Sequence, residues 1–247
     1  MKLGEMNWPD IQDLAKDQLV GVYPIASFEQ HGPHLPLLTD TLETEEIVNR
    51  LDQRIADQVV CLPAQWLGYS FHHMRFGGSL TATSGTHIRI IVETVSGLIG
   101  AGFNKVLIVN GHGGNQPDLR VALQDLKEQH DEARVYGASW WEVAAARLAQ
   151  IKEAGAAGSG HAGEMETSLM LAIHPDLVKT DRFRDNSIRR ESEYASSIVE
   201  FRRMDEWSEP GHWGDPTVAS AEKGEQMLTA IVDSLEEIVG QIRGGTL

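Results

Sequence analysis

The chain contains a short apolar stretch, NKVLIVN at residues 104–110, which is followed at once by the glycine-rich sequence GHGGN. An unbroken apolar run of this length is typical of a strand buried on both faces, as in a parallel sheet. The stretch DQLVGVYPIAS at residues 17–27 has the same character, and the polar sequence EQH follows it after one residue. Ligand sites in open α/β sheets lie beyond the carboxyl ends of the strands. The sequence therefore predicts a parallel sheet with a site formed by residues 29–31 and 110–115.

Strand-like and helix-like patterns alternate along the rest of the chain. Further strands are expected at 58–66 and 133–139. Helices are expected at 41–56, 84–102, 115–132 and 219–243, with two more starting near Trp141 and His161. This order predicts an α/β fold: one domain, 1–247, built as a three-layer α/β/α sandwich with a central, mostly parallel sheet. The irregular region 182–215 is interpreted as a lid, an oligomer arm or a solvated loop.

Composition excludes several classes of protein. The formal net charge of −15 argues against non-specific nucleic-acid binding, which needs a basic surface. No apolar run is long enough to cross a bilayer, and the N-terminal residues lack the apolar core of a signal peptide. The one cysteine, Cys61, cannot form an internal disulfide. We therefore expect a cytoplasmic protein that acts on a small molecule and binds neither nucleic acid nor membrane.

The first polar cluster offers three metal-binding side chains. Glu29 and His31 are two residues apart at the end of an extended segment, so both can face one cavity. Two prolines then stiffen a return path that can bring Asp40 back towards Glu29. Asp40 has two oxygens and could bridge two cations, although capping the following helix is an alternative role. For Glu29 and His31, the alternatives are an exposed carboxylate and a histidine that caps a turn.

Two later clusters add three candidates. His112 is surrounded by three glycines at a strand end, where the backbone can turn sharply and approach a ligand closely. His161 and Glu164 are three residues apart, so they would share a face if a helix begins there. Acidic residues are also common in the first turn of a helix for electrostatic reasons, which is the alternative for Glu164. His72 and His73 could line the mouth of a pocket, but paired histidines in a polar loop are usually solvated.

Together these clusters supply two histidines and three carboxylates as ligands. Such a mixed set suits Zn²⁺ first, or Mn²⁺ or Fe²⁺, and two ions roughly 3.5–4 Å apart could activate a bridging water. We expect Glu29, His31, Asp40, His112 and Glu164 to bind two divalent ions per chain, and His161 to remain free as a catalytic proton carrier.

Long motifs of the chain resemble those of the creatininase family. The resemblance rests on SFEQHGPHLPLLTD at 27–40, KVLIVNGHGGN at 105–115 and HAGEMETSLML at 161–171. The segments FHHMRFGGSL and GDPTVASAEKG match weaker family motifs in the same order. The resemblance implies an α/β fold, often a homohexamer, and a binuclear metal site that hydrolyses C–N bonds of cyclic or linear amides. One ion would take Glu29, Asp40 and His112, and the other would take His31, Asp40 and a further carboxylate.

Two departures from creatinine amidohydrolases bear on the substrate. Those enzymes carry Tyr-Glu, whose Glu binds metal, where this chain has Gly113-Gly114, so we assign the missing ligand to Glu164. They also carry Trp-Asp where this chain has Ala157-Gly158. Creatinine is therefore a poor substrate candidate. The alternatives are hydrolysis of a C–C bond in a keto-inositol and a non-catalytic metal-binding member of the family.

Overall fold

Four parallel strands form the sheet of the computed structural model, which describes residues 1–155, 158–188 and 200–247. Their order is β2-β1-β3-β4, and each neighbouring pair is parallel. The strands are β1 (Val20–Ile25), β2 (Val59–Cys61), β3 (Lys105–Asn110) and β4 (Arg134–Ser139). The predicted parallel sheet is confirmed. β2 ends earlier than the expected 58–66 because Pro24 of β1 has no amide proton with which to continue the ladder beyond Leu62, whose own amide still donates to Val22.

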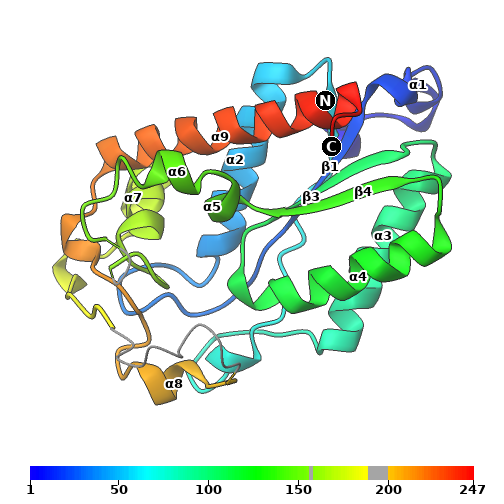
Figure 1. Cartoon of the computed structure of the whole chain (residues 1–247). Helices are drawn as coiled ribbons and strands as arrows, with labels where there is room; N and C mark the ends of the chain where they lie inside the picture. The colour runs from blue at the N-terminus through cyan, green and yellow to red at the C-terminus, as the bar shows by residue number, and fades with distance from the viewer. Residues whose placement is uncertain (156–157, 189–199) are drawn as a thin grey trace.

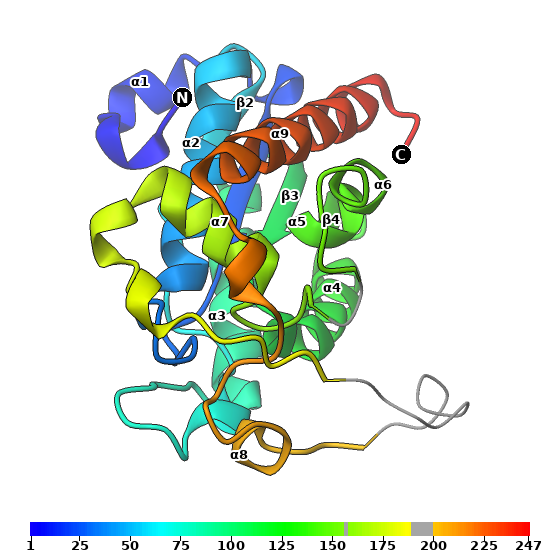
Figure 2. The same cartoon turned by 90° about the vertical axis from the view of Figure 1, so that its left-hand side faces the viewer.

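Helices cover both faces of the sheet (Figure 1). One face packs against α2 (Thr39–Ile55) and α9 (Ala221–Gly244). The short helices α5 (Trp140–Val143) and α6 (Ala145–Leu148) pack in the same layer. The other face packs against α3 (Ser84–Gly100) and α4 (Gln116–Gln129). Figure 2 shows α7 (Glu164–Ile173) beside α2 and α9. The predicted three-layer α/β/α arrangement is therefore confirmed.

The residues of β3 show how the two core layers arise. Val106 and Ile108 join the core under α3 and α4, whereas Leu107 and Val109 join the core under α2 and α9. Successive side chains of a strand point to opposite faces of its sheet. Since both faces are covered, residues 106–109 are all apolar, and this part of the strand shows no alternation of polar and apolar side chains.

Helix starts place the functional loops at one edge of the sheet. α2 begins at Thr39, directly after the proline-containing loop that follows β1. α4 begins at Gln116, after a 3₁₀ turn at Gly113–Asn115 that follows β3. α7 begins at Glu164, three residues after His161, near which a helix was predicted to start. His161 lies in the turn before the helix, where Ala162 has the left-handed φ of 52°.

The described part of the region 182–215 packs on these loops. Asn186 pairs with Gly214, and the amide of Trp213 donates to the carbonyl of His161 at 2.7 Å. A short helix, α8 (Met204–Trp207), lies within this region, and α1 (Trp8–Gln12) lies near the N-terminus. Residues 189–199 lie outside the described residues, so a role of 182–215 as lid or oligomer arm stays a prediction. Among the helices that the structure describes, none has the length and apolarity to cross a bilayer.

Candidate metal centre

The loop after β1 folds back on itself as its prolines predict. The amide of Glu29 donates to the carbonyl of Leu37 at 2.9 Å, and this closes the loop just before α2. Asp40, the second residue of α2, is thereby brought beside Glu29 and His31. No side chain caps this helix at Leu38, so the alternative role of Asp40 as a helix cap is not realised. The carboxylate of Asp40 is buried and faces the loops instead.

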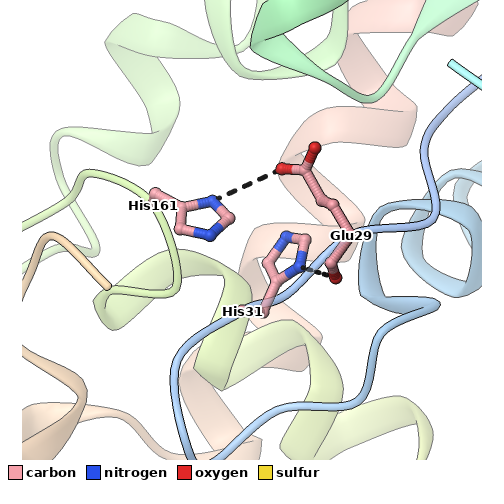
Figure 3. Close-up of side chains that lie close together, drawn as sticks. All are labelled: Glu29, His31 and His161. Carbon is pink, nitrogen blue, oxygen red and sulfur yellow. Dashed lines mark hydrogen bonds and ion pairs between the residues drawn. The ribbon is translucent and has the colours of Figure 1, made fainter. Parts of the chain in front are cut away.

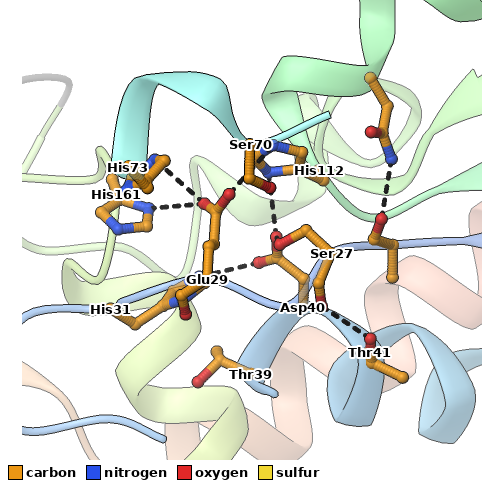
Figure 4. A network of polar contacts seen from close by, with 12 residues as sticks. Ser27, Glu29, His31, Thr39, Asp40, Thr41, Ser70, His73, His112 and His161 are labelled. Carbon is orange, nitrogen blue, oxygen red and sulfur yellow. Dashed lines mark hydrogen bonds and ion pairs between the residues drawn. The ribbon is translucent and has the colours of Figure 1, made fainter. Parts of the chain in front are cut away.

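Asp40 lies between two histidine rings (Figure 4). Its Oδ1 is 2.8 Å from Nε2 of His31, and its Oδ2 is 3.0 Å from Nδ1 of His112. Ser27 also donates to Oδ2 at 2.7 Å. His112 reaches this place because Gly111 lets the end of β3 approach α2: a Cβ at position 111 would collide with Oγ1 of Thr44. Each oxygen of one carboxylate therefore faces a different ring nitrogen.

Backbone carbonyls fix which nitrogen each ring presents. Nδ1 of His31 donates to the carbonyl of Glu29 at 3.0 Å, and Nε2 of His112 donates to the carbonyl of Tyr69 at 3.0 Å. A carbonyl only accepts, so these nitrogens carry the protons. In a neutral ring the other nitrogen then turns a lone pair towards Asp40, which repels the carboxylate unless a proton or a metal ion lies between them. Orientation of a histidine by a carbonyl on its far nitrogen is typical of metal ligands.

Glu29 is a second buried carboxylate at the same place. Its Oε1 lies 3.1 Å from Nε2 of His73, and its Oε2 lies 3.2 Å from Nε2 of His112. Neither contact has hydrogen-bond geometry, and the one donor near this carboxylate in the described ranges that lowers its pKa by hydrogen bonding is the Ser70 hydroxyl, which does not reach standard hydrogen-bond geometry either. Buried carboxylates are nearly always satisfied by donors or by metal ions. The buried carboxylate of Glu29 and the imidazoles around it are thus suited to bind a cation.

The electrostatics of the cluster favour positive charge at its centre. Burial raises the pKa of Glu29 to about 7, although His112 opposes this. Burial would lower the pKa of His31, but Asp40 outweighs it and raises that pKa to about 10. Burial would also lower the pKa of His112, which Glu29 and Asp40 raise to about 9. Despite burial, the two rings hold the pKa of Asp40 well below its usual range. Carboxylates that hold protons on neighbouring imidazoles also attract metal ions.

His161 lies at the edge of this cluster, where the prediction placed a free histidine (Figure 3). Its Nε2 donates to the backbone carbonyl of Gln30 at 2.8 Å, and its Nδ1 lies 3.8 Å from Oε1 of Glu29. Its ring packs against that of His31, with centroids 4.3 Å apart. Burial and the neighbouring His31 hold the pKa of His161 well below its usual range. The ring is therefore neutral and presents Nδ1 as a proton acceptor.

Glu164 does not join the other predicted ligands, and this corrects the prediction. Its carboxylate accepts from the amides of Glu153 and Ala154 at 3.0 and 2.8 Å and from Nζ of Lys223 at 2.8 Å. Glu166 takes the expected place: an oxygen of Glu166 and donor atoms of His31 and Asp40 lie within 4.8 Å of one another. The prediction assumed a helix that already included His161. Since α7 begins at Glu164, His161 lies outside the helix and does not fix which face of it turns to the cluster; residues 164 and 166 project about 200° apart, and only Glu166 faces the cluster.

Two histidines that the sequence left unassigned also reach the cluster. His73 is buried, and its Nδ1 accepts from Nε2 of Gln30 at 2.6 Å. Its protonated Nε2 therefore faces Glu29. His72 is half-buried, and burial together with the nearby His112 lowers its pKa to about 3. The sequence signal was the HH pair itself, but residues that contact it or its neighbours, such as Phe201 beside His72 and Gly211 beside Gln30, lie far away in the chain.

The cluster forms one wall of a cavity of about 260 Å³. A larger hollow of about 600 Å³ adjoins it, and the two share His72, Gly113, Gly114 and Met204. The outer hollow is lined by aromatic side chains and one arginine from the region 182–215, namely Phe201, Arg202, Trp207 and Trp213. Trp207 and Trp213 are stacked, with ring centroids 5.5 Å apart. The cavity at the cluster thus opens into a wider aromatic groove.

Comparisons with known proteins agree with this geometry. The sequence model of the family described as creatininase, creatinine amidohydrolase, matches residues 4–239. A mycofactocin precursor peptide peptidase of Mycobacterium ulcerans (strain Agy99) is 29% identical over 94% of this chain and 88% of its own. The crystal structure of a creatinine amidohydrolase is 25% identical, covers 97% of this chain and 96% of its own, and superposes with a TM-score of 0.86. A creatininase mutant described as Zn-Zn type has the same identity over 97% of each chain, with a TM-score of 0.85.

Proposed function

The protein belongs to the creatininase family of amidohydrolases, and from this premise we propose that it hydrolyses a C–N amide bond with two divalent metal ions. The observation that carries the proposal is the position of Asp40 between Nε2 of His31 and Nδ1 of His112. A carboxylate that faces two ring lone pairs in opposite directions suits a bridge between two cations. With only one ion bound, the other contact would have to remain an ion pair between Asp40 and a protonated imidazole.

The donor groups divide into two sets that share Asp40. Glu29 and His112 lie on one side of Asp40, and His31 and Glu166 lie on the other. Glu166 thus replaces Glu164 as the carboxylate ligand in the proposal. Oxygen and imidazole donors without thiolate suit Zn²⁺ first, with Mn²⁺ or Fe²⁺ as alternatives. Such ions, when bound, supply Lewis acidity for the hydrolysis of a carbonyl substrate.

The chain's own residues supply orientation and proton transfer. Gln30 holds two loops in place, because its side-chain amide donates to Nδ1 of His73 and to the carbonyl of Gly211, each at 2.6 Å. Its backbone carbonyl fixes the ring of His161. Nδ1 of His161 therefore faces the cavity beside Glu29 and can take a proton and pass it to the leaving nitrogen. We assign His161 this role as general acid–base.

We propose that the substrate is a linear amide larger than creatinine. The cavity at the cluster opens into the aromatic groove of about 600 Å³, more room than a single small ring would need. One relative is named as a precursor peptide peptidase, which favours a peptide-like amide over a cyclic one. Of the two positions that depart from creatinine amidohydrolases, Gly114 lines the cavity, whereas Ala157 lies outside the described residues.

One experiment tests the proposal as a whole. The purified protein is stripped with a chelator, reloaded with Zn²⁺ or Mn²⁺, and analysed for bound metal. It is then assayed on short peptides, linear amides, creatinine and keto-inositols. We expect two ions per chain and hydrolysis of an amide that depends on the metal. Cleavage of a keto-inositol alone would move the enzyme to C–C hydrolysis. One ion per chain would refute the binuclear site, and bound metal without any turnover would favour a non-catalytic role.

Two further properties belong to the proposal. We expect a cytoplasmic protein, which fractionation of the source cells would test. We also expect a homo-oligomer, and a hexamer by family resemblance. Light scattering coupled to size exclusion would measure its mass, and a monomeric mass near the chain's own 27.2 kDa would contradict the oligomer.

A further inference from the structure

His72 brings a second imidazole to the Glu29 side of the cluster. It belongs to the 3₁₀ turn Phe71–His73, which lies in the loop between β2 and α3. Its ring is stacked on that of His112, with centroids 5.6 Å apart and planes 12° apart. One of its ring nitrogens, an oxygen of Glu29 and a ring nitrogen of His112 all lie within 4.8 Å of one another. A carboxylate and two imidazoles at such distances form a donor set for a transition-metal cation.

The Nδ1 atom of His72 has no use in the protein's own hydrogen bonding. It is buried and has no hydrogen-bond partner among the residues that the structure describes. Buried polar atoms are seldom left in this state, because their lost hydration is costly. His73 differs in this respect, since its Nδ1 already accepts from Gln30. Of the two neighbouring histidines, His72 is therefore the one with a buried nitrogen left to satisfy.

The residues after His112 cannot supply a donor at this place. A Cβ at position 114 would collide with the carbonyl oxygen of Tyr69 and with Nε2 of His112, and would lie 2.8 Å from Cε1 of His72. Gly114 is thus required by close packing, and the ring of His72 occupies the space in front of it. A donor on this side must come from another segment, and the turn at Phe71–His73 provides it.

We propose that His72 is a metal-binding residue, which together with Glu29 and His112 holds the cation on their side of Asp40. The inference rests on the proposed two-metal function and adds a ligand that the motifs did not assign. It also gives the two ions different surroundings. The ion beside Glu29 would have two imidazole donors and would lie next to the aromatic groove, because His72 lines both hollows.

The test compares metal binding by His72→Phe and the parent enzyme. Phenylalanine keeps a planar ring that can stack on His112 but has no nitrogen. Metal-free protein is titrated with Zn²⁺, and bound ions are counted by elemental analysis. We expect the parent to bind two ions, and His72→Phe to bind one with parental affinity and the other about 10²-fold more weakly, or not at all. Phe71→Leu is the matched control, because it alters the exposed neighbour in the same turn and should bind both ions normally.

A second variant keeps the test decisive if His72→Phe folds poorly. His72→Cys should place a thiolate on the ion, and Co²⁺ loading should then produce a sulfur-to-cobalt charge-transfer band that the parent lacks. Two ions with parental affinities in His72→Phe, or no such band in a Co²⁺-loaded His72→Cys, would overturn the role of His72 and leave the two-metal proposal standing. Fewer than two ions in the parent would refute both proposals.

Discussion

Nε2 of His31 lies 2.8 Å from Oδ1 of Asp40, although the loop between these residues contains two prolines and lacks regular structure. The prolines restrict the loop, and the hydrogen bond from Glu29 to Leu37 closes it. The contact between a ring in the loop after β1 and a carboxylate in the first turn of α2 is therefore set before any ligand binds. A preformed pair of this kind binds a cation without the cost of ordering the loop.

Asp40→Ala should remove more metal than His31→Ala. Asp40 faces donor groups on both sides, whereas His31 belongs to one side only. On the two-metal premise, bound metal should fall towards zero in the first variant and by about half in the second. Elemental analysis after gel filtration measures this, with Asp118→Ala as a control for loss of a buried aspartate whose partners are Ser84 and His87 and not the cluster. Equal losses in both variants would show that Asp40 does not bridge.

Glu166 and Glu164 should respond to Gln substitution in opposite ways. Glu166→Gln should lose the ion beside His31, because its carboxylate is grouped with His31 and Asp40. Glu164→Gln should keep both ions and destabilise the fold by about 1–3 kcal/mol, because Lys223 and two amides lose a charged acceptor. Metal analysis and urea unfolding distinguish the two. Loss of metal in the Glu164 variant would reinstate the original assignment.

The ion pair between Glu164 and Lys223 makes the free energy of unfolding depend on pH. Lys223 and the two amides lower the pKa of Glu164 in spite of its burial. A carboxyl with a depressed pKa in the fold contributes stability above its unfolded pKa and loses it as pH falls through the folded value. The free-energy difference between parent and Glu164→Gln should therefore be largest near neutral pH and shrink in acid. Urea unfolding of metal-free proteins at pH 7 and below pH 4 measures it, and a constant difference would contradict the ion pair.

Metal affinity should rise with pH. In the metal-free protein the pKa of His31 is raised to about 10 and that of His112 to about 9, so both rings carry protons that a metal must displace. The proton on His31 stabilises the metal-free fold below its unfolded pKa of about 6.5, and this contribution is lost as pH rises through about 10. Zn²⁺ should therefore raise the melting temperature more at pH 8.5 than at pH 6.5.

Calorimetric titration in buffers of different ionisation enthalpy provides the check on that result, since metal binding should release protons at pH 7. His31→Ala should release fewer protons than the parent. An affinity that stays constant between pH 6.5 and 8.5, with no proton release, would show that neither ring is protonated in the metal-free protein.

The aromatic groove predicts a preference for extended amides. Phe201 is exposed at its rim and lies 6.2 Å from the ring of His72, measured between centroids. Phe201→Ala should raise KM for a peptide-like substrate by about tenfold and leave bound metal unchanged, because only contacts to the substrate are lost.

Creatinine should be a weak substrate or none, and turnover on it at about 1 s⁻¹ or faster would refute this expectation.

The positions of the functional loops followed from the sequence because they depend on local patterns. Apolar runs located β1 and β3, and the glycines and prolines after them indicated sharp turns, so Glu29, His31, Asp40 and His112 were placed correctly together. The assignment of Glu164 as a ligand was wrong because the side chain that faces the cluster depends on where α7 begins, and helix ends are poorly determined by local pattern. A shift of a few residues changes which side chain faces the cluster.

His72 and His73 could not be placed from the sequence for a different reason. Their burial depends on contacts with distant segments: Gln30, which bonds His73, is itself held by the carbonyl of Gly211. A pair of histidines in a loop carries no local signal of such cover. The same holds for Lys223, which pairs with Glu164 from the first turn of α9 and is 59 residues away in the chain.

His161→Gln should separate catalysis from metal binding. The glutamine amide can donate to the carbonyl of Gln30 much as Nε2 of His161 does, so the loop before α7 should keep its place. The variant lacks a group that can accept and release a proton at the position of Nδ1, which lies 3.8 Å from Glu29. Both ions should remain bound, and kcat should fall by about 10²–10⁴, the usual contribution of general acid–base catalysis. His174→Gln, at the far end of α7, is the matched control and should leave kcat unchanged.

The acidic limb of the pH–rate profile should also change in the His161 variant, because a neutral imidazole is the active form. Loss of one ion from His161→Gln would instead make His161 a ligand, consistent with its grouping with Glu29 and His31, and would overturn its role in proton transfer.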